Sequence, residues 1–275
     1  MVEGSESLGI RHAVVDPAGR RLAYSDTGSG NPTVVLDGGL SHGMDTWELV
    51  LPGLAPLTRV VAYDRAGVGA SDSAPTPRTS REVVDDLHAL LGALAVPGPY
   101  VLVGFSFGGT NMRLYAHQFP HEVCAMVLVD ALHPETLGRT LALLPPPGDG
   151  DSDTPAVADY RQDLFRGQLD PSKNREGIDR RASEAQVRDA QPLGDRPLVV
   201  LSRGKPAQRP ADFPLPLAGR IEAVRWALQL DLARLSSHSL HLVATESDHL
   251  IPFSQPDLVI GAIRHVVEAV RAVWR

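Results

Sequence analysis

The sequence contains very little cysteine: Cys124 is the only one among 275 residues. A lone cysteine excludes an intrachain disulfide and any metal site made of several cysteines. Cys124 opens a short apolar run, so we expect it to be a small residue of the core. Long apolar runs are also missing, since none approaches the ~18 residues that a transmembrane helix needs. We therefore predict no membrane span.

Positive charge is sparse as well. The chain has 26 basic and 33 acidic residues, a net charge of −7, and no run of Lys or Arg stands out. This balance argues against a nucleic-acid partner. Residues 1–7 lack the basic-then-apolar pattern of a signal peptide, which favours a cytoplasmic protein. Hydrophobic residues make up 43% of the chain, and the length suits one α/β domain that carries an insertion.

Motifs for cofactors and metals are absent too. The glycines lack the spacing of a dinucleotide fingerprint or a P-loop, and no HExxH motif or carboxylate cluster suggests a metal. We therefore expect neither a cofactor nor a metal ion.

Short apolar runs alternate with segments of helical spacing along most of the chain. Runs at 8–15 and 20–26 flank the turn Asp16-Pro-Ala-Gly19 and predict a hairpin. The other predicted strands are 33–36, 59–63, 100–103, 124–129, 197–201 and 239–244, and the predicted helices are 46–57 with Asp45 as a cap, 80–94, 107–119 and 254–274. The apolar strands lack an alternating polar face, which is typical of a parallel sheet buried on both sides.

Residues 132–196 interrupt this alternation. They hold Pro145-Pro-Pro147, an acidic glycine-rich stretch to Asp153 and a polar helical stretch to about Gln191. The segment is too long for an ordinary connection, so we predict a cap or lid inserted where the strand ends would hold a ligand. A disordered surface loop is the alternative, above all near 145–155. The expected units are a core of 1–131 and 197–275 and a cap of 132–196.

One short motif predicts chemistry. The apolar run at 100–103 leads into Gly104-Phe-Ser106-Phe-Gly108, and a helical segment follows at once. Gly-x-Ser-x-Gly between a strand and a helix is the context of a nucleophile elbow, a sharp turn that exposes the serine hydroxyl. The same pattern occurs at Gly39-Leu-Ser41-His-Gly43, but glycines separate Ser41 from its strand and no helix abuts it. We therefore predict Ser106 as the nucleophile, and a helix-capping serine is the alternative role.

Together these features resemble the α/β-hydrolase family. The resemblance covers 8–130 and 197–275, and its marks are Gly38-Gly39-Leu40 with Trp47 downstream, the loop 63–72, the elbow 104–108 and Glu246-Ser-Asp-His249. It implies a doubly wound, mostly parallel sheet of about eight strands with a helical cap after strand six, and the triad order Ser…Asp…His. The cap falls outside the resemblance. The loop 64–72 is interpreted as structural, with Arg65 paired to Asp72.

A serine nucleophile needs a base, and the base needs an acid that orients it. His249 follows the last strand in a short polar loop, where the resemblance puts the catalytic histidine; His238 and His241 are expected to be structural.

Most relatives carry the acid after the strand at 197–201, but no carboxylate follows that strand until Asp212. Asp130 ends the preceding strand, an arrangement that some relatives share. We predict Asp130 as the acid, with Asp212 as the alternative and Asp248 as a loop residue.

The family supplies two backbone N–H groups to an oxyanion hole. The resemblance puts one at Phe107, after the nucleophile, and the other at Leu40, where Gly38-Gly39 replaces the usual His-Gly pair. Four residues are candidates for the substrate pocket: His42, Phe105, Leu132 and Ile251. His42 could instead belong to a surface loop, and the apolar positions could be simple core.

The resemblance implies a serine hydrolase of the carboxylic ester type, acting on a small, largely apolar ester, lactone or thioester. Three alternatives use the same residues: C–C bond hydrolysis, polyketide-type thioester release and a slow ligand sensor. A peptide-cleaving relative is a weaker one, since the insertion shows no acidic cluster that would bind an amine.

Overall fold

The computed structural model describes residues 9–274, and within them eight strands form one sheet. The order is β1-β2-β4-β3-β5-β6-β7-β8. β2 runs antiparallel to β1 and β4, and the other neighbouring pairs are parallel. The strands are β1 (Arg11–Val14), β2 (Arg21–Thr27), β3 (Thr33–Asp37), β4 (Val60–Tyr63), β5 (Tyr100–Phe105), β6 (Val123–Val129), β7 (Leu198–Arg203) and β8 (Ser239–Ala244). The predicted mostly parallel α/β sheet is thus confirmed. Residues 1–8, with the start of the first predicted strand, lie outside the described residues.

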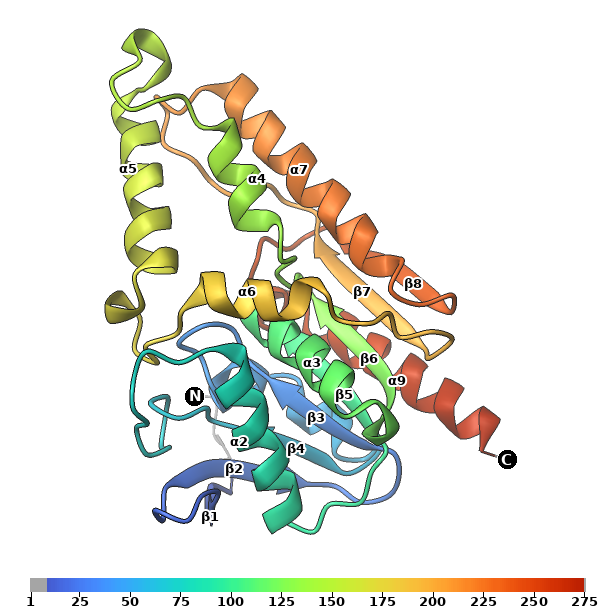
Figure 1. Cartoon of the computed structure of the whole chain (residues 1–275). Helices are drawn as coiled ribbons and strands as arrows, with labels where there is room; N and C mark the ends of the chain where they lie inside the picture. The colour runs from blue at the N-terminus through green and yellow to red at the C-terminus, as the bar shows by residue number, and fades with distance from the viewer. Residues whose placement is uncertain (1–8, 275) are drawn as a thin grey trace, which may run out of the picture.

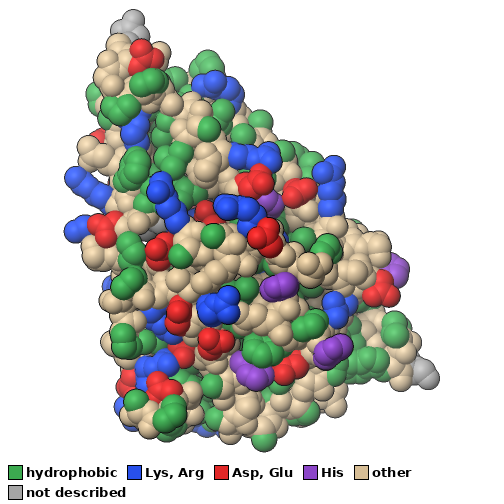
Figure 2. Space-filling model, in the orientation of Figure 1, with side chains coloured by type: hydrophobic (Ala, Val, Ile, Leu, Met, Phe, Trp, Pro, Cys, Tyr) green, Lys and Arg blue, Asp and Glu red, His purple; other side chains and the backbone are tan. Residues whose placement is uncertain are grey.

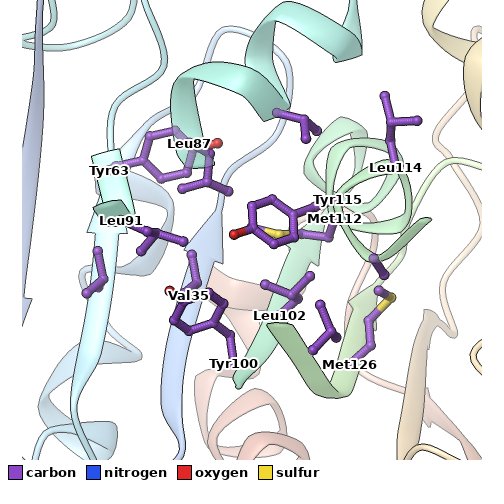
Figure 3. Packing of buried hydrophobic residues seen from close by; sticks show 14 of the residues in the cluster. Val35, Tyr63, Leu87, Leu91, Tyr100, Leu102, Met112, Leu114, Tyr115 and Met126 are labelled. Carbon is purple, nitrogen blue, oxygen red and sulfur yellow. The ribbon is translucent and has the colours of Figure 1, made fainter. Parts of the chain in front are cut away.

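Helices cover both faces of the sheet (Figure 1). α2 (Ser80–Ala93), α3 (Phe107–Gln118) and the end of α7 (Leu215–Ala233) pack on one face, and α1 (Leu51–Leu54) and α9 (Pro256–Val273) on the other. Figure 3 shows the apolar core on the face covered by α2 and α3. There Leu87 and Leu91 of α2 and Met112 and Tyr115 of α3 meet Leu102 of β5. β3 and β5 are buried along their whole length, as expected for central parallel strands.

The predicted helix at 46–57 is wrong in its continuity. The segment forms a 3₁₀ turn, η1 (Met44–Trp47), and then the separate short helix α1. Pro52 has no N–H to donate to an earlier carbonyl, but it is tolerated in a first helical turn, where it lies in α1. Asp45 does not cap a long helix; its carboxylate accepts from the N–H groups of Gly43 and Thr46.

α7 is a helix that the sequence pattern did not predict. Leu217, Ile221, Leu228 and Leu232 lie on its buried side, while apolar side chains such as Trp226 are exposed. Apolar residues on both sides blur the helical periodicity that marks an amphipathic helix.

The long segment between β6 and β7 is largely helical in the described residues. It contains α4 (Thr136–Leu143), η3 (Gly150–Ser152), α5 (Pro155–Asp163), the π-helical turn η4 (Leu164–Leu169), η5 (Pro171–Lys173), α6 (Arg180–Arg188) and a short loop to β7. Figure 1 shows α4 and α5 extending away from the sheet beside the start of α7, with α6 crossing between them and α3. A small apolar cluster joins Val157 of α5 to Phe213 and to Leu217 and Ile221 of α7. The long insertion therefore shares its apolar core with a segment that follows β7.

The surface in this orientation carries both signs of charge. Figure 2 shows basic and acidic side chains interspersed over this face, including the area over α6, and no large area of one sign.

Candidate active site

Ser106 occupies the turn between β5 and α3. Its φ is +53° with ψ −117°, a conformation that residues other than glycine rarely adopt. Three backbone hydrogen bonds hold it: its N–H donates to Val129 (3.0 Å), and its carbonyl accepts from Gly109 (3.1 Å) and Leu132 (3.0 Å). The strained turn is thus fixed by the neighbouring strand β6 and by the segment that follows it.

The glycines of the elbow are required by close backbone contacts. A Cβ at Gly104 would lie 2.5 Å from the Cα of Gly109, and one at Gly108 would lie 2.3 Å from the carbonyl oxygen of Asp37. Real Cβ atoms do not approach backbone so closely, so α3 can begin directly beside β3 only with glycine here.

Ser106, His249 and Asp130 form a continuous chain of hydrogen bonds. The Nε2 of His249 lies 3.0 Å from the Oγ of Ser106, and its Nδ1 lies 2.7 Å from the Oδ2 of Asp130. The three residues follow β5, β6 and β8, whose C-terminal ends meet at one edge of the sheet. His249 keeps 38% of its side chain exposed, whereas Ser106 is 9% exposed. A molecule can therefore approach the serine and the histidine from solvent.

Asp130 is buried and its second oxygen has cationic surroundings. Oδ1 accepts from the backbone N–H of Arg203 at 3.2 Å and lies 3.5 Å from the guanidinium of Arg225. Burial raises the pKa of Asp130, but the hydrogen bond and charge of His249, with the charges of Arg203 and Arg225, outweigh it and leave the pKa below its ordinary value. The lowered pKa leaves Asp130 ionised at neutral pH, with its Oδ2 in hydrogen-bond contact with His249.

The loop after β3 crosses directly over the elbow. A Cβ at Gly39 would lie 3.5 Å from the Cβ of Ser106, so the backbone around Leu40 passes beside the serine. In the described part of the chain, the N–H groups of Leu40 and Phe107 have no acceptor. Both N–H groups, which the sequence predicted as the oxyanion donors, are thus not used by another acceptor among the described residues.

Arg65 is the buried cation behind this loop, and the predicted pair with Asp72 is wrong. Asp72 instead pairs with Arg21 on β2. Arg65 binds two carboxylates, Asp37 at 2.5 Å and Glu176 at 2.6 Å. It also donates to the carbonyl oxygens of Gly38, Gly39 and His42. A buried guanidinium can bridge both because its five donors point in a fixed fork. Gly67 and Gly69 of the same loop have positive φ values of +83° and +53°.

Residues 32–186 match the family model described as alpha/beta hydrolase fold. The chain belongs to this family. The match includes the elbow, Asp130 and most of the helical insertion.

Two curated proteins illustrate the relatives of this alpha/beta hydrolase. The protein YqjL of Bacillus subtilis is 28% identical over 87% of this chain and 85% of its own length. The "Probable transporter efuK" of Hormonema carpetanum is 26% identical over 88% of this chain. The chain spans only 40% of the length of that second relative.

A solved structure shows the same fold. It is a thermophilic esterase from Thermogutta terrifontis with malate bound, 24% identical, with a TM-score of 0.64 over 95% of this chain and 98% of that one. At this identity the likeness speaks for a shared architecture.

The four predicted pocket residues occupy different environments. Leu132 is half-buried and packs with Leu40 against Phe107 and Ile178, next to the elbow. Phe105 is almost fully buried, with its ring 4.8 Å from that of His249. Ile251 is fully buried in the core on the α9 side, and the side chain of His42 is exposed. Of these residues, only Leu132 offers accessible apolar surface beside Ser106; Phe105 and Ile251 present almost none in this structure.

The other candidates have separate partners. Asp212 accepts from the N–H of Ala156 at the start of α5, and Asp248 accepts from the N–H of Leu250. His238 contacts the carbonyl of Asp195 and His241 the hydroxyl of Ser202. The N–H of Ser41 donates to Glu176. None of these residues contacts the Ser106–His249–Asp130 chain through a hydrogen bond among the described residues.

Two other functional features are absent from residues 9–274. There is no group of three or more His, Cys, Asp and Glu side chains arranged to hold a metal ion. No helix in the described part of the chain has the length and apolar character needed to cross a membrane.

Sequence reasoning missed three residues of this neighbourhood. Arg225 lies on the unpredicted helix α7, and Glu176 lies in the insertion, where no motif marks it. Arg203 ends β7, the strand after which the resemblance puts the usual acid, and its backbone N–H binds Asp130. The missing carboxylate after the strand at 197–201 was the one sequence signal that drew attention to the end of β7.

Proposed function

We propose that this protein is a serine hydrolase of the carboxylic ester type, with Ser106 as nucleophile, His249 as base and Asp130 as acid. The observation that carries the proposal is the unbroken hydrogen-bond chain from Ser106 through His249 to the buried Asp130. Family membership and the esterase fold likeness support hydrolytic chemistry. A strained turn that aims a serine at a solvent-facing histidine supports covalent catalysis.

The proposed reaction has two stages, acylation of Ser106 and hydrolysis of the acyl-enzyme. The Oγ of Ser106 adds to the carbonyl carbon of the substrate while its proton passes to the Nε2 of His249. The N–H groups of Leu40 and Phe107 stabilise the resulting oxyanion. The intermediate collapses, the C–O or C–S bond breaks, and the leaving group takes the proton from His249. Water then adds to the acyl-enzyme with His249 as base, and the acid product leaves as Ser106 regains its proton.

The substrate is proposed to be a small ester, lactone or thioester with an apolar acyl part. The support is the apolar set beside the oxyanion donors, which comprises Leu40, Leu132, Phe107 and Ile178. Ile178 comes from the insertion and is buried, so this segment packs against the residues next to the serine. We propose 132–196 as a cap on a core of 1–131 and 197–275. The cytoplasmic location stays a prediction.

The test is a panel of p-nitrophenyl esters of rising chain length, aromatic and aliphatic lactones, acyl thioesters and vinylogous diketones, run on wild type and Ser106→Ala. We expect turnover of at least one apolar member, and a loss of roughly 10³-fold or more in kcat in the variant. Turnover confined to vinylogous diketones would favour C–C bond hydrolysis. Ligand-induced thermal stabilisation without product would favour a sensor. Equal turnover by both proteins would refute Ser106 as nucleophile.

A further inference from the structure

Glu176 is a buried carboxylate of the insertion that reaches the loop beside the elbow. It lies between η5 and α6, and the residue is 1% exposed. Its Oε2 accepts from the Nε of Arg65 at 2.6 Å. Its Oε1 accepts from the Nη2 of Arg65 at 2.9 Å and from the backbone N–H of Ser41 at 2.6 Å. Three donors thus converge on one carboxylate, two of them in the bidentate geometry that arginine favours.

Arg65 extends this contact to the loop backbone. Its Nη2 donates to the carbonyl oxygen of Gly39 at 2.5 Å, and its Nη1 donates to that of Gly38 at 2.8 Å. Nη1 of Arg65 also donates to the Oδ1 of Asp37 at 2.5 Å. Asn111 donates to the second carboxylate oxygen of Asp37 at 2.8 Å. The guanidinium therefore lies between β3 on one side and the insertion on the other, with the loop held against it.

These bonds fix two peptide groups, one on each side of Leu40. In a planar trans peptide the C=O and N–H point in opposite directions. Because the carbonyl of Gly39 faces Arg65, the N–H of Leu40 in the same peptide group faces away from Arg65. The next peptide group is held by the bond from Ser41 N–H to Glu176. Glu176 thus contacts one of these peptides directly and holds, through Arg65, the group that orients the other.

We propose that Glu176 is a positioning residue through which the insertion sets the direction of the Leu40 N–H, and so couples the insertion to the oxyanion hole. The inference rests on the proposed function for its catalytic consequence, but the positioning itself is a property of the loop. Charge supports the arrangement, since a buried Arg65 between two carboxylates keeps its own charge satisfied, and removal of one partner is strongly disruptive.

The test variant is Glu176→Gln, which keeps the shape but offers one acceptor oxygen to three donors. Its amide NH₂ must face an N–H of Arg65 or of Ser41. The matched control is Glu184→Gln, because Glu184 is a buried carboxylate of the same insertion that pairs with Arg180 at 2.8 Å and has no bond to the loop. Should Glu176→Gln fail to fold, Glu176→Asp keeps the charge and withdraws the carboxylate by one methylene.

The first readout is hydrogen exchange of the backbone amides at 38–42, which needs no activity. We expect faster exchange at Ser41 in Glu176→Gln and an unchanged rate in Glu184→Gln. The second readout is the rate at which a fluorophosphonate labels Ser106, since that reaction also develops charge on an oxygen beside the serine. We expect a fall of about 10–100-fold in Glu176→Gln, and less than about twofold in the control. On the best ester, kcat should fall while KM changes little.

The two readouts separate the possible failures. Absence of labelling in wild type would refute the proposed function, while the exchange data would still decide whether Glu176 holds the loop. Unchanged exchange at Ser41, or equal slowing of labelling in both glutamine variants, would overturn the inference.

Discussion

At the scale of single residues, the candidate site is mainly a set of hydrogen bonds around His249 and Asp130. The positions of Ser106 and His249 could be predicted because each follows a strand and belongs to a short motif. Asp130 was predicted from its place at a strand end, from the missing carboxylate after 197–201 and from the resemblance. The cations that face Asp130 could not be predicted, because Arg225 lies 95 positions further along the chain and no local pattern marks it.

The acid assignment leads to a direct substitution test. Asp130→Asn should lower kcat by about 10³–10⁴-fold, because His249 would lose both the acceptor that sets its tautomer and the negative charge that stabilises the imidazolium. Asp212→Asn is the matched control, and it should retain activity because Asp212 binds the start of α5 instead. Steady-state kinetics and circular dichroism measure activity and folding together. The opposite ranking of the two variants would refute the assignment.

The lowered pKa of Asp130 predicts that the free energy of unfolding depends on pH. Its pKa is lowered in the folded protein, so ionised Asp130 stabilises the fold above the unfolded carboxyl value of about 3.9. This contribution is lost as pH falls through the folded pKa. The difference in free energy of unfolding between wild type and Asp130→Asn should therefore shrink from pH 7 to pH 3. Urea unfolding at the two pH values measures it, and a difference that grows on acidification would contradict the lowered pKa.

At the scale of elements, the strands and the elbow were predictable and some helices were not. β5, Ser106 and α3 follow one another without a break, so their local pattern is complete. The pattern failed where Pro52 divides the helical segment after β3, and at α7, whose apolar residues face both the protein and solvent. Local spacing indicates elements with one apolar face and misses those whose apolar residues are distributed around the helix.

The contact between α3 and the β3 loop predicts an intolerant glycine. A Cβ at Gly108 would lie 2.3 Å from the carbonyl of Asp37 and 2.6 Å from that of Gly38. Gly108→Ala should therefore cost about 1–3 kcal/mol of stability, which lowers the Tm by several degrees. Gly92→Ala is the control in α2, where nothing lies within 4 Å of the added Cβ, and it should be neutral or stabilising by up to about 1 kcal/mol. Thermal unfolding compares them; similar Tm values would argue against the close packing.

At the scale of the whole molecule, the sheet and the insertion are connected by contacts between distant parts of the chain. Glu176 and Arg65 are 111 positions apart, and Val157 of the insertion shares an apolar cluster with Phe213 and Leu217. Such pairings carry no periodic signal, which is why the sequence predicted the existence of an insertion but not its anchoring. The family match ends at residue 186, within this same region.

The single cysteine offers a reporter of global unfolding. Burial between β5 and β6 raises the pKa of the Cys124 thiol to about 12. At pH 8 the native thiolate fraction is then roughly 10³-fold below that of an unfolded cysteine. Iodoacetamide should alkylate Cys124 slowly in the native protein and rapidly in urea, with the rate following the unfolding curve measured by circular dichroism. Rapid alkylation of the native protein would contradict the raised pKa of this half-buried thiol.

The most direct test of the central claim is labelling of the folded protein by a fluorophosphonate, followed by intact mass and peptide mapping. We predict one adduct, on Ser106, that is retained in Ser41→Ala and lost in Ser106→Ala. An adduct on another serine, or none at all on folded wild-type protein, would contradict the proposed nucleophile.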